Sequence, residues 1–272
     1  MTLKELILAA LKEDLPDGDL TTDSLGLQGR TGHARILAKE DLVVSGCDVF
    51  VAVLHAMAPT IQVKWLVEDG QFVWSQQTIC TLQGPLPALL KAERTALNFF
   101  GRLSGIATLT RCYVQQVEHT GCKILDTRKT TPLLRDLEKS AVRHGGGQNH
   151  RRNLSEAILI KDNHIQAVGG VSAAITMIRS QNKLPIEIEC ENITQVQQAS
   201  ALNVAWILLD NFNDTDLKEA LKIIPSTIQT EASGNMTLER VRRVAEMGVH
   251  AISIGALTHS APTADLSLEF EK

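Results

Sequence analysis

The feature that most constrains the fold is an alternation of short apolar runs with helical runs, which fills the chain beyond Gly105. The apolar runs recur every ~20 to 35 residues, a spacing typical of strands that alternate with helices in a parallel sheet. The sequence therefore predicts an α/β fold with the strands CKILD, AILIKD, IEIECE, WILLDN, TIQTEAS and AISIGA.

Polar residues or glycine close each of these runs. In a barrel or a doubly wound sheet the active site lies at the carboxyl ends of the strands. Turn chemistry explains one or two such endings, but hardly all of them. We therefore expect one site at this edge, built from Asp126, Arg128, Lys129, Lys161, Asp162, Glu189, Glu191, Asp210, Asn211, Glu231, Ser233 and Gly255.

A cluster of basic residues lies between Asp126 and His164, in a chain whose formal net charge is only −4. Such a local excess of cations predicts an anionic ligand, although a charge run also commonly faces water. Arg128, Arg151 and Lys161 are the stronger candidates, because they stand beside strand ends or a glycine run. Two arginines there can bind carboxylates in a bidentate manner.

Within this cluster a glycine run at 145–147 precedes His150. Glycine readily adopts positive φ, so the run can turn backbone donors onto an anion. His150 is an equal candidate for a structural and a ligand-binding role. Upstream, Arg135, Lys139 and Arg143 recur every four residues and would form one basic stripe on a helix. That stripe fits a solvated face as well as a ligand site.

Two carboxylates, Glu189 and Asp210, end neighbouring runs and should face each other at the mouth of the sheet. Such a pair can hold Mg²⁺ through oxygen or water ligands, or accept hydrogen bonds from sugar hydroxyls. Ion pairing with Lys161 or Lys129 is the alternative. Both arrangements can hold together, because a magnesium-bound anion would sit among those lysines.

The last two runs lead into short loops that contain glycine. Ser233, Gly234 and Asn235 form the first loop, and Gly255 begins the second. In barrels the corresponding loops commonly bind a phosphate group through backbone N–H groups. The position of these loops in the series therefore predicts a phosphate site.

The amino-terminal part of the chain has a different pattern. Residues 3–11 carry an apolar stripe at helical spacing, and residues 33–82 read as short strands with one inserted helix. A helix is expected again from residue 88 to residue 109. Gly101 and Gly105 in that helix permit either close packing or a break, and we expect the domain boundary near the second of them.

Composition narrows the possible partners and the compartment. The balance of 27 basic and 31 acidic residues, a pI near 6.1 and 4% aromatic residues argue against a broad nucleic-acid surface. The five cysteines include no CxxC pair, so we expect reduced, mostly buried thiols and neither a disulfide framework nor a zinc site. Without a signal peptide or a membrane span of ~18 apolar residues, the sequence predicts a cytoplasmic protein with no membrane partner.

Eight stretches between Glu93 and Ser260 read ERTALNFFGRLSGIAT, DTRKTTP, EKSAVRHGGGQNHR, LIKDNHI, IEIECEN, LLDNF, EASGN and SIGALTHS. In this order they resemble the motifs of the quinolinate phosphoribosyltransferase family, and EDLPDGDLTT near the amino terminus is a weaker match. The resemblance implies an incomplete α/β barrel (105–261) with an N-terminal α/β sandwich domain (1–104) that the tail 262–272 joins. It also implies a homodimer, or a higher oligomer built from dimers, in which each sandwich covers the other barrel's mouth.

The resemblance also implies roles for single residues and one metal ion, Mg²⁺. The residues implied to bind a pyridine dicarboxylate are Arg94, reaching from the neighbouring subunit, Arg128, His150, Arg151 and Lys161. Those implied to surround phosphoribosyl pyrophosphate are Lys129, Glu189, Asp210, Ser233, Gly234, Asn235 and Gly255. Among them the catalytic set is Lys129, Lys161, Glu189 and Asp210, the last two also being the metal ligands.

Three positions depart from the family pattern. Leu133 stands where glycine usually follows TTP, His144 replaces a common cysteine, and Asn235 replaces a second glycine after SG. Asparagine tolerates the left-handed backbone better than most residues, so we expect the phosphate loop to be preserved.

The implied activity is decarboxylating phosphoribosyl transfer from phosphoribosyl pyrophosphate to quinolinate, giving nicotinate mononucleotide, pyrophosphate and CO₂ in NAD biosynthesis. One alternative is a Schiff-base aldolase that uses Lys161 at the end of its strand. Others are a non-catalytic sensor of a phosphate ligand and a relative of the molybdenum-transport ModD family. The complete LIKDNHI motif favours the quinolinate enzyme over the ModD relative.

Overall fold

The structure is a computed structural model that describes residues 1–271. Internal contacts divide the chain into two compact units. The first comprises residues 1–111, 130–146 and a segment beginning at Leu257, and the second comprises 112–129 and 147–256. The predicted boundary between residues 104 and 105 falls inside one long helix, α4 (Leu86–Val117). No helix of the described chain is long and apolar enough to cross a membrane.

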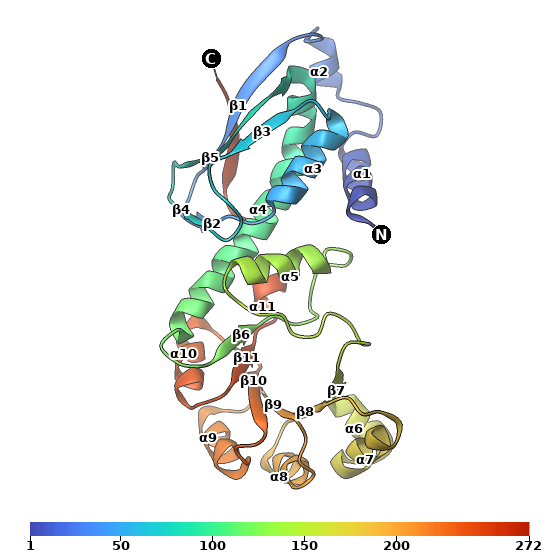
Figure 1. Cartoon of the computed structure of the whole chain (residues 1–272), viewed down its shortest axis with the longest axis vertical. Coiled ribbons are helices and arrows are strands. Elements are labelled where there is room, and N and C mark those ends of the chain that lie inside the picture. The colour runs from blue at the N-terminus through green and yellow to red at the C-terminus, as the bar shows by residue number, and fades with distance from the viewer. Residues whose placement is uncertain (272) are drawn as a thin grey trace. The chain divides into compact units, whose positions relative to one another are not determined.

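The first unit is an antiparallel sheet packed against helices (Figure 1). Its four-stranded sheet has the order β12-β1-β5-β3, and β2 pairs with β4. In chain order the elements are α1 (Leu3–Asp14), α2 (Leu20–Ser24), β1 (Thr31–Ala38), β2 (Leu42–Val43), α3 (Cys47–Met57), β3 (Gln62–Trp65), β4 (Phe72–Val73), β5 (Thr78–Pro85), α4, α5 (Arg135–His144) and β12 (Leu266–Phe270).

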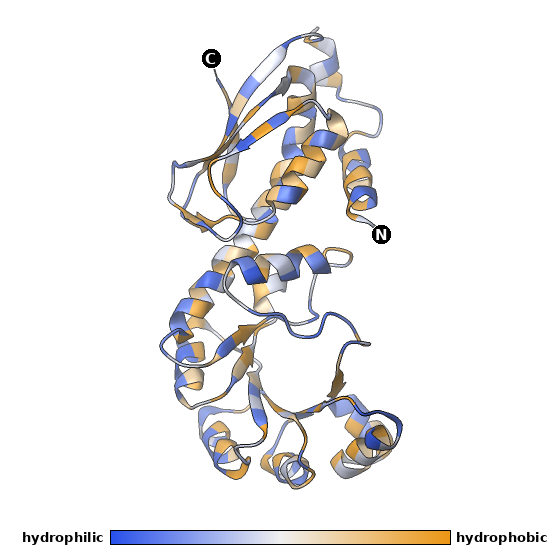
Figure 2. Ribbon diagram, viewed as in Figure 1, coloured by the Kyte–Doolittle hydropathy of each residue, from blue (hydrophilic) through white to orange (hydrophobic). Residues whose placement is uncertain are grey.

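The core of this unit lies between the sheet and helices α3 and α4. Phe50 of α3 and Phe100 of α4 are fully buried, with ring centroids 5.2 Å apart, and Trp65 of β3 lies 5.8 Å from each ring. Aromatic rings bury large apolar areas, so this cluster joins the helices to the sheet. Figure 2 shows the matching alternation of apolar and polar residues around α3 and α4.

Helix α4 passes through Gly101 and Gly105 without a break. A β-carbon at Gly101 would lie 2.8 Å from the carbonyl oxygen of Ala264, and one at Gly105 only 1.8 Å from that of Pro262. Of the two predicted roles for these glycines, close packing is therefore correct. They let the carboxyl-terminal segment run directly against the helix.

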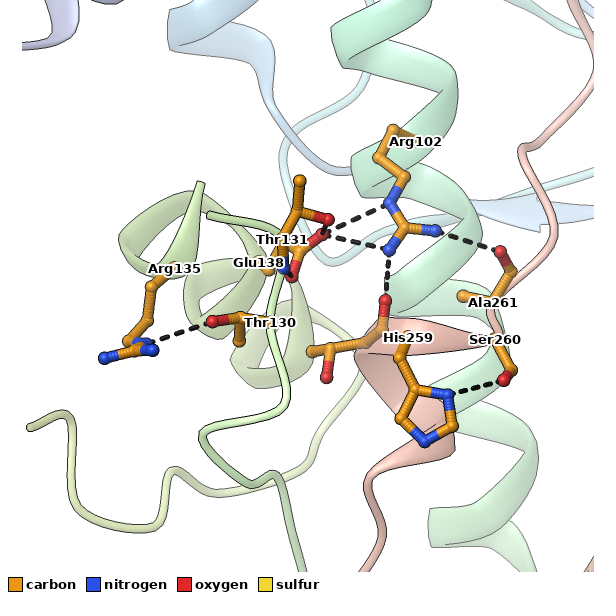
Figure 3. Close-up of polar contacts among 9 residues, drawn as sticks. Arg102, Thr130, Thr131, Arg135, Glu138, His259, Ser260 and Ala261 are labelled. Atoms are coloured by element: carbon orange, nitrogen blue, oxygen red, sulfur yellow. Dashed lines mark hydrogen bonds and ion pairs between the residues drawn. The ribbon is translucent and has the colours of Figure 1, made fainter. Parts of the chain in front are cut away.

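A buried ion pair joins three parts of the first unit (Figure 3). Glu138 of α5 is fully buried and lies 2.9 Å from Nη2 of Arg102 on α4. The same carboxylate accepts hydrogen bonds from the backbone N–H and the hydroxyl of Thr131, at 3.0 and 2.8 Å. Arg102 also donates to the carbonyl oxygens of Thr258 and Ala261. Because every partner is buried or hydrogen-bonded, loss of either charge would leave an uncompensated one.

Helix α5 corrects two sequence predictions. Lys139 is buried, with only 3% of its surface exposed, whereas Arg143 is exposed, so the predicted basic stripe is not one solvated face. The N–H groups of Gly145 and Gly146 donate to the carbonyl oxygens of Ala141 and Arg143 at the end of the helix. These two glycines therefore cap α5, and the prediction that they turn their donors onto an anion is wrong.

The second unit is a parallel sheet of six strands, as predicted, and the strand order is β6-β11-β10-β9-β8-β7 (Figure 1). No ladder joins β6 to β7 within the described residues, so the barrel is incomplete. Its elements are β6 (Lys123–Leu125), β7 (Ile158–Ile160), α6 (Asp162–Val168), α7 (Val171–Gln181), β8 (Ile186–Cys190), α8 (Ile193–Ala201), β9 (Trp206–Asp210), α9 (Asp214–Ile223), β10 (Gln229–Ser233), α10 (Leu238–Glu246) and β11 (Ala251–Ser253). The next helix, α11 (Ala256–His259), belongs to the first unit from Leu257 on.

Candidate active site

Strand register places the polar residues of the second unit on one face of its sheet. Leu208 of β9 is paired with Glu189 of β8 and with Glu231 of β10, and Ser233 is paired with Asp210. Side chains on paired residues of adjacent strands point the same way. A cavity of about 340 Å³ opens on this face, lined by Thr127, Arg128, Lys129, His150, Arg151, Leu159, Lys161, Glu189, Leu208, Asp210, Glu231, Ser233 and Ser253.

The acidic wall of the cavity consists of Glu189 and Asp210. Burial raises the pKa of Glu189, with Lys161 opposing the shift and Asp210 adding to it. The ammonium of Lys161 lies 3.5 Å from a carboxylate oxygen of Glu189. The expected ion pair with Lys161 therefore exists, and the carboxylates of Glu189 and Asp210 interact, while binding of Mg²⁺ or sugar hydroxyls stays a prediction. A divalent cation would offset their repulsion, so the donor set fits Mg²⁺.

The basic wall consists of Arg128, Lys129 and Arg151. Arg151 is held by a hydrogen bond of 2.9 Å from Nη1 to the carbonyl oxygen of Ala157. Burial, followed by repulsion from Arg128, lowers the pKa of Arg151. An anion between the two guanidinium groups would relieve this repulsion, and carboxylates match the guanidinium geometry. The wall is thus prepared for an anionic ligand.

The structure adds Glu187, which the sequence did not single out, to a cluster with His150 and Glu231, both named as candidates from the sequence. His150 Nε2 is 3.2 Å from Glu187 and 3.7 Å from Glu231, and the ligand atoms of the three residues lie within 4.8 Å of one another. Burial, followed by the Glu187 carboxylate, raises the pKa of Glu231 to about 8. Alternation in IEIEC puts Glu187 on the same face as Glu189, and this was the signal that could have revealed it.

Comparison with known proteins decides the family. Residues 106–269 match the C-terminal domain of quinolinate phosphoribosyl transferase, and residues 19–104 match its N-terminal domain. The chain belongs to the quinolinate phosphoribosyltransferase family. Members of this family are phosphoribosyltransferases, so the predicted family and enzyme class are confirmed.

Individual relatives of the quinolinate phosphoribosyltransferase family match along nearly the whole chain. A probable nicotinate-nucleotide pyrophosphorylase (carboxylating) of Synechocystis is 42% identical, covering 95% of this chain and 89% of the relative. The corresponding Bacillus subtilis protein is 39% identical, covering 99% and 93%. The crystal structure of the Ehrlichia chaffeensis nicotinate-nucleotide pyrophosphorylase has a TM-score of 0.95 at 39% identity, covering 100% and 99%. The predicted fold class is confirmed.

Four of the residues that the family resemblance implied do not line the cavity. Arg94 is exposed on α4 in the first unit. Gly234 and Asn235 follow β10, where both have positive φ, and Gly255 follows β11. The remaining implied residues, Arg128, Lys129, His150, Arg151, Lys161, Glu189, Asp210 and Ser233, all line it.

The cluster of His150, Glu187 and Glu231 has the composition of a metal site, but its hydrogen bonding argues otherwise. Nδ1 of His150 accepts a hydrogen bond of 2.7 Å from the backbone N–H of Arg151. In neutral histidine the other nitrogen then carries the proton, so Nε2 presents its N–H to Glu187, 3.2 Å away. A metal would need a lone pair on Nε2. The cluster therefore orients the imidazole, which in turn accepts a hydrogen bond from the backbone of Arg151.

Replacing Glu231 by glutamine should change how stability depends on pH. Between pH 4.5 and about 8 folded Glu231 keeps a proton that the unfolded chain releases, so its contribution to the free energy of unfolding falls as pH rises. The variant lacks this titration, and its stability relative to the unmodified protein should increase across the window. Urea unfolding at several pH values measures this. Glu239→Gln, at an exposed carboxylate, is the control, and an equal pH dependence in both variants would contradict the prediction.

Proposed function

We propose that this protein catalyses decarboxylating phosphoribosyl transfer from phosphoribosyl pyrophosphate to quinolinate, giving nicotinate mononucleotide, pyrophosphate and CO₂ in NAD biosynthesis. The observation that supports it is one cavity with an acidic wall, Glu189 and Asp210, and a basic wall that includes Arg128 and Arg151. The names of the full-length relatives carry the same activity.

Quinolinate carries two carboxylates beside a ring nitrogen, and the basic wall suits it. Arg128 and Arg151 hold the carboxylates, while the carbonyl oxygen of Ala157 holds the Arg151 guanidinium and His150 holds the Arg151 backbone N–H. Held in this way, the ring nitrogen can be aimed at the anomeric carbon of the second substrate. Positioning two reactants converts a bimolecular step into an effectively unimolecular one, which accounts for much of the catalysis.

Transfer forms a bond between the ring nitrogen and the anomeric carbon and breaks the bond from that carbon to pyrophosphate. Glu189 and Asp210 accept hydrogen bonds from the ribose hydroxyls and stabilise the electron-poor carbon. Lys129 and Lys161 stabilise the negative charge that develops on the leaving group. Mg²⁺, held by Glu189 and Asp210, would supply further positive charge to the pyrophosphate oxygens.

Decarboxylation follows from the chemistry of the alkylated ring. Its positive nitrogen stabilises the carbanion left when the adjacent carbon–carboxylate bond breaks and CO₂ departs. A proton then replaces the carboxylate on that carbon. No protein nucleophile is required for either step.

The ligand-binding loops, the oligomer and the compartment also belong to this proposal. Gly234, Asn235 and Gly255 lie in loops beyond strand ends, where backbone N–H groups can meet the phosphate of the ribose. Arg94, which is exposed, would complete the site of a neighbouring subunit in a homodimer. A cytoplasmic location stays a prediction.

One assay tests the proposed function. Purified protein is incubated with quinolinate, phosphoribosyl pyrophosphate and Mg²⁺, and nicotinate mononucleotide and CO₂ are measured. Both should form in equal amounts, and omission of either substrate should abolish both. Binding without release of pyrophosphate would indicate a sensor instead. A borohydride-trapped adduct on Lys161 would indicate an aldolase, although Lys161 is 45% exposed and pairs with Glu189, unlike a desolvated Schiff-base lysine.

A further inference from the structure

The loops that follow β9 and β10 both contain left-handed backbone. Asn211 has φ 57°, Gly234 has φ 89° and Asn235 has φ 50°. Left-handed conformations are unfavourable for residues with a β-carbon, even for asparagine, which tolerates them best. Contacts from outside the loops must therefore hold them in place.

Arg240 of α10 supplies these contacts. Its Nη1 donates to the carbonyl oxygen of Gly234 at 3.0 Å and to that of Asn235 at 3.5 Å. Its Nη2 donates to the carbonyl oxygen of Phe212 in the other loop. Nε lies 3.5 Å from a carboxylate oxygen of Asp214, and only 17% of the Arg240 side chain is exposed. One planar guanidinium thus holds the backbone of both loops at once.

A short chain of hydrogen bonds leads from these loops to the cavity. Nδ2 of Asn235 lies 3.3 Å from Oδ1 of Asn211, and Nδ2 of Asn211 donates to Oδ2 of Asp210 at 2.7 Å. The backbone N–H of Asn211 donates to the carbonyl oxygen of Ser233 at 3.0 Å. Gly234 leaves room for this network, since a β-carbon there would lie 2.1 Å from Oδ1 of Asn211.

We propose that Arg240 is a positioning residue, which sets the Asp210 carboxylate and the Ser233 loop for the phosphoribosyl substrate without touching it. Arg240 does not line the cavity, so it acts through the two loops. The proposal rests on the function proposed above. Its consequence is selective, because Arg240 contacts the loops after β9 and β10, whereas binding of quinolinate is assigned to Arg128 and Arg151 on the basic wall.

Arg240→Gln should raise the KM for phosphoribosyl pyrophosphate about tenfold, the effect of losing hydrogen bonds made by one charged group. The KM for quinolinate should stay unchanged. Arg240→Lys should behave like the glutamine variant, because lysine keeps the charge near Asp214 but lacks the fork that reaches three carbonyl groups. Circular dichroism and thermal melting establish that each variant is folded at the assay temperature.

Arg243→Gln is the matched control. Arg243 lies on the same helix and 3.4 Å from the same Asp214, but it is 59% exposed. This variant should keep both KM values. Hydrogen exchange on the unliganded proteins gives a readout that does not depend on activity. Amides at 211–213 and 234–236 should exchange faster in both Arg240 variants and at the original rate in Arg243→Gln.

The outcomes separate this proposal from the proposed function. Faster exchange in the loops together with the KM split supports Arg240 as a positioning residue. Unchanged exchange, or a parallel rise of both KM values, would overturn it, and so would full activity of Arg240→Lys. An unmodified protein that forms no nicotinate mononucleotide would refute the proposed function, while the exchange measurement would still decide whether Arg240 holds the loops.

Discussion

Replacing Glu189 by alanine is expected to lower kcat/KM by about 10²- to 10³-fold, the usual cost of removing one preorganised charged or polar group from an active site. Glu189 lies within the cavity, 3.5 Å from Lys161, and interacts with Asp210. The same substitution removes a carboxylate whose burial is unfavourable, as its raised pKa shows. The fold should therefore survive, and loss of turnover will report chemistry and not unfolding.

Two further variants sharpen this test. Glu191→Ala removes an exposed carboxylate two residues along the chain that does not line the cavity, and it should retain activity. Lys161→Ala should lose activity like Glu189→Ala, since Lys161 is expected to stabilise the leaving group. Steady-state assays with circular dichroism on each variant decide the matter. Near-normal turnover by both Glu189→Ala and Lys161→Ala would refute their assigned roles.

The sequence predicted the parallel sheet well because its signals are local. Apolar runs, turns and helical runs repeat with regular spacing, and the residue after each run is at the carboxyl end of a strand. Lys161, Glu189 and Asp210 were found in this way, and the structure gathers them around one cavity.

Residues inside the strands were harder to predict. Glu187 was missed because it lies near the middle of an apolar run, whereas Glu231 was named as a strand-end residue. Only the pairing register brings Glu187 and Glu231 together at His150, 3.2 and 3.7 Å from its Nε2. Register depends on contacts between segments distant in sequence, and no local pattern contains it.

The glycine run at 145–147 shows a second reason why a prediction from sequence can be wrong. Positive φ at Gly146, 88°, was compatible with the predicted anion loop. What decides the role of the run is a neighbour remote in sequence, because a β-carbon at Gly145 would lie 2.3 Å from the carbonyl oxygen of Ala107. The glycine is required by packing between α5 and α4, and the sequence around it gives no sign of that contact.

The structure shows the backbone conformation and the contacts of the three residues that depart from the family pattern. Leu133 has φ 69°, which is unfavourable for a residue with a β-carbon, and its side chain is exposed. His144 has polar partners in the first unit, with Nδ1 2.9 Å from the Ser45 hydroxyl and 4.0 Å from Asp69. Asn235 keeps the left-handed backbone, and its side-chain Nδ2 lies 3.3 Å from Oδ1 of Asn211. Two of the three thus bring contacts that a smaller residue could not make.

Gly105→Ala should destabilise the protein by about 3 kcal/mol, the upper part of the range for overpacking a close-packed site. The new methyl group would lie 1.8 Å from the carbonyl oxygen of Pro262, and a backbone atom cannot turn aside as a flexible side chain can. The direction of the change in stability is informative, because replacing glycine by alanine inside a helix normally stabilises a protein by roughly 0.5–1 kcal/mol. Thermal and urea unfolding measure the loss. Gly121→Ala, where a β-carbon meets nothing within 4 Å, is the control and should leave stability nearly unchanged. An unaltered midpoint for Gly105→Ala would mean that the carboxyl-terminal segment does not pack against α4.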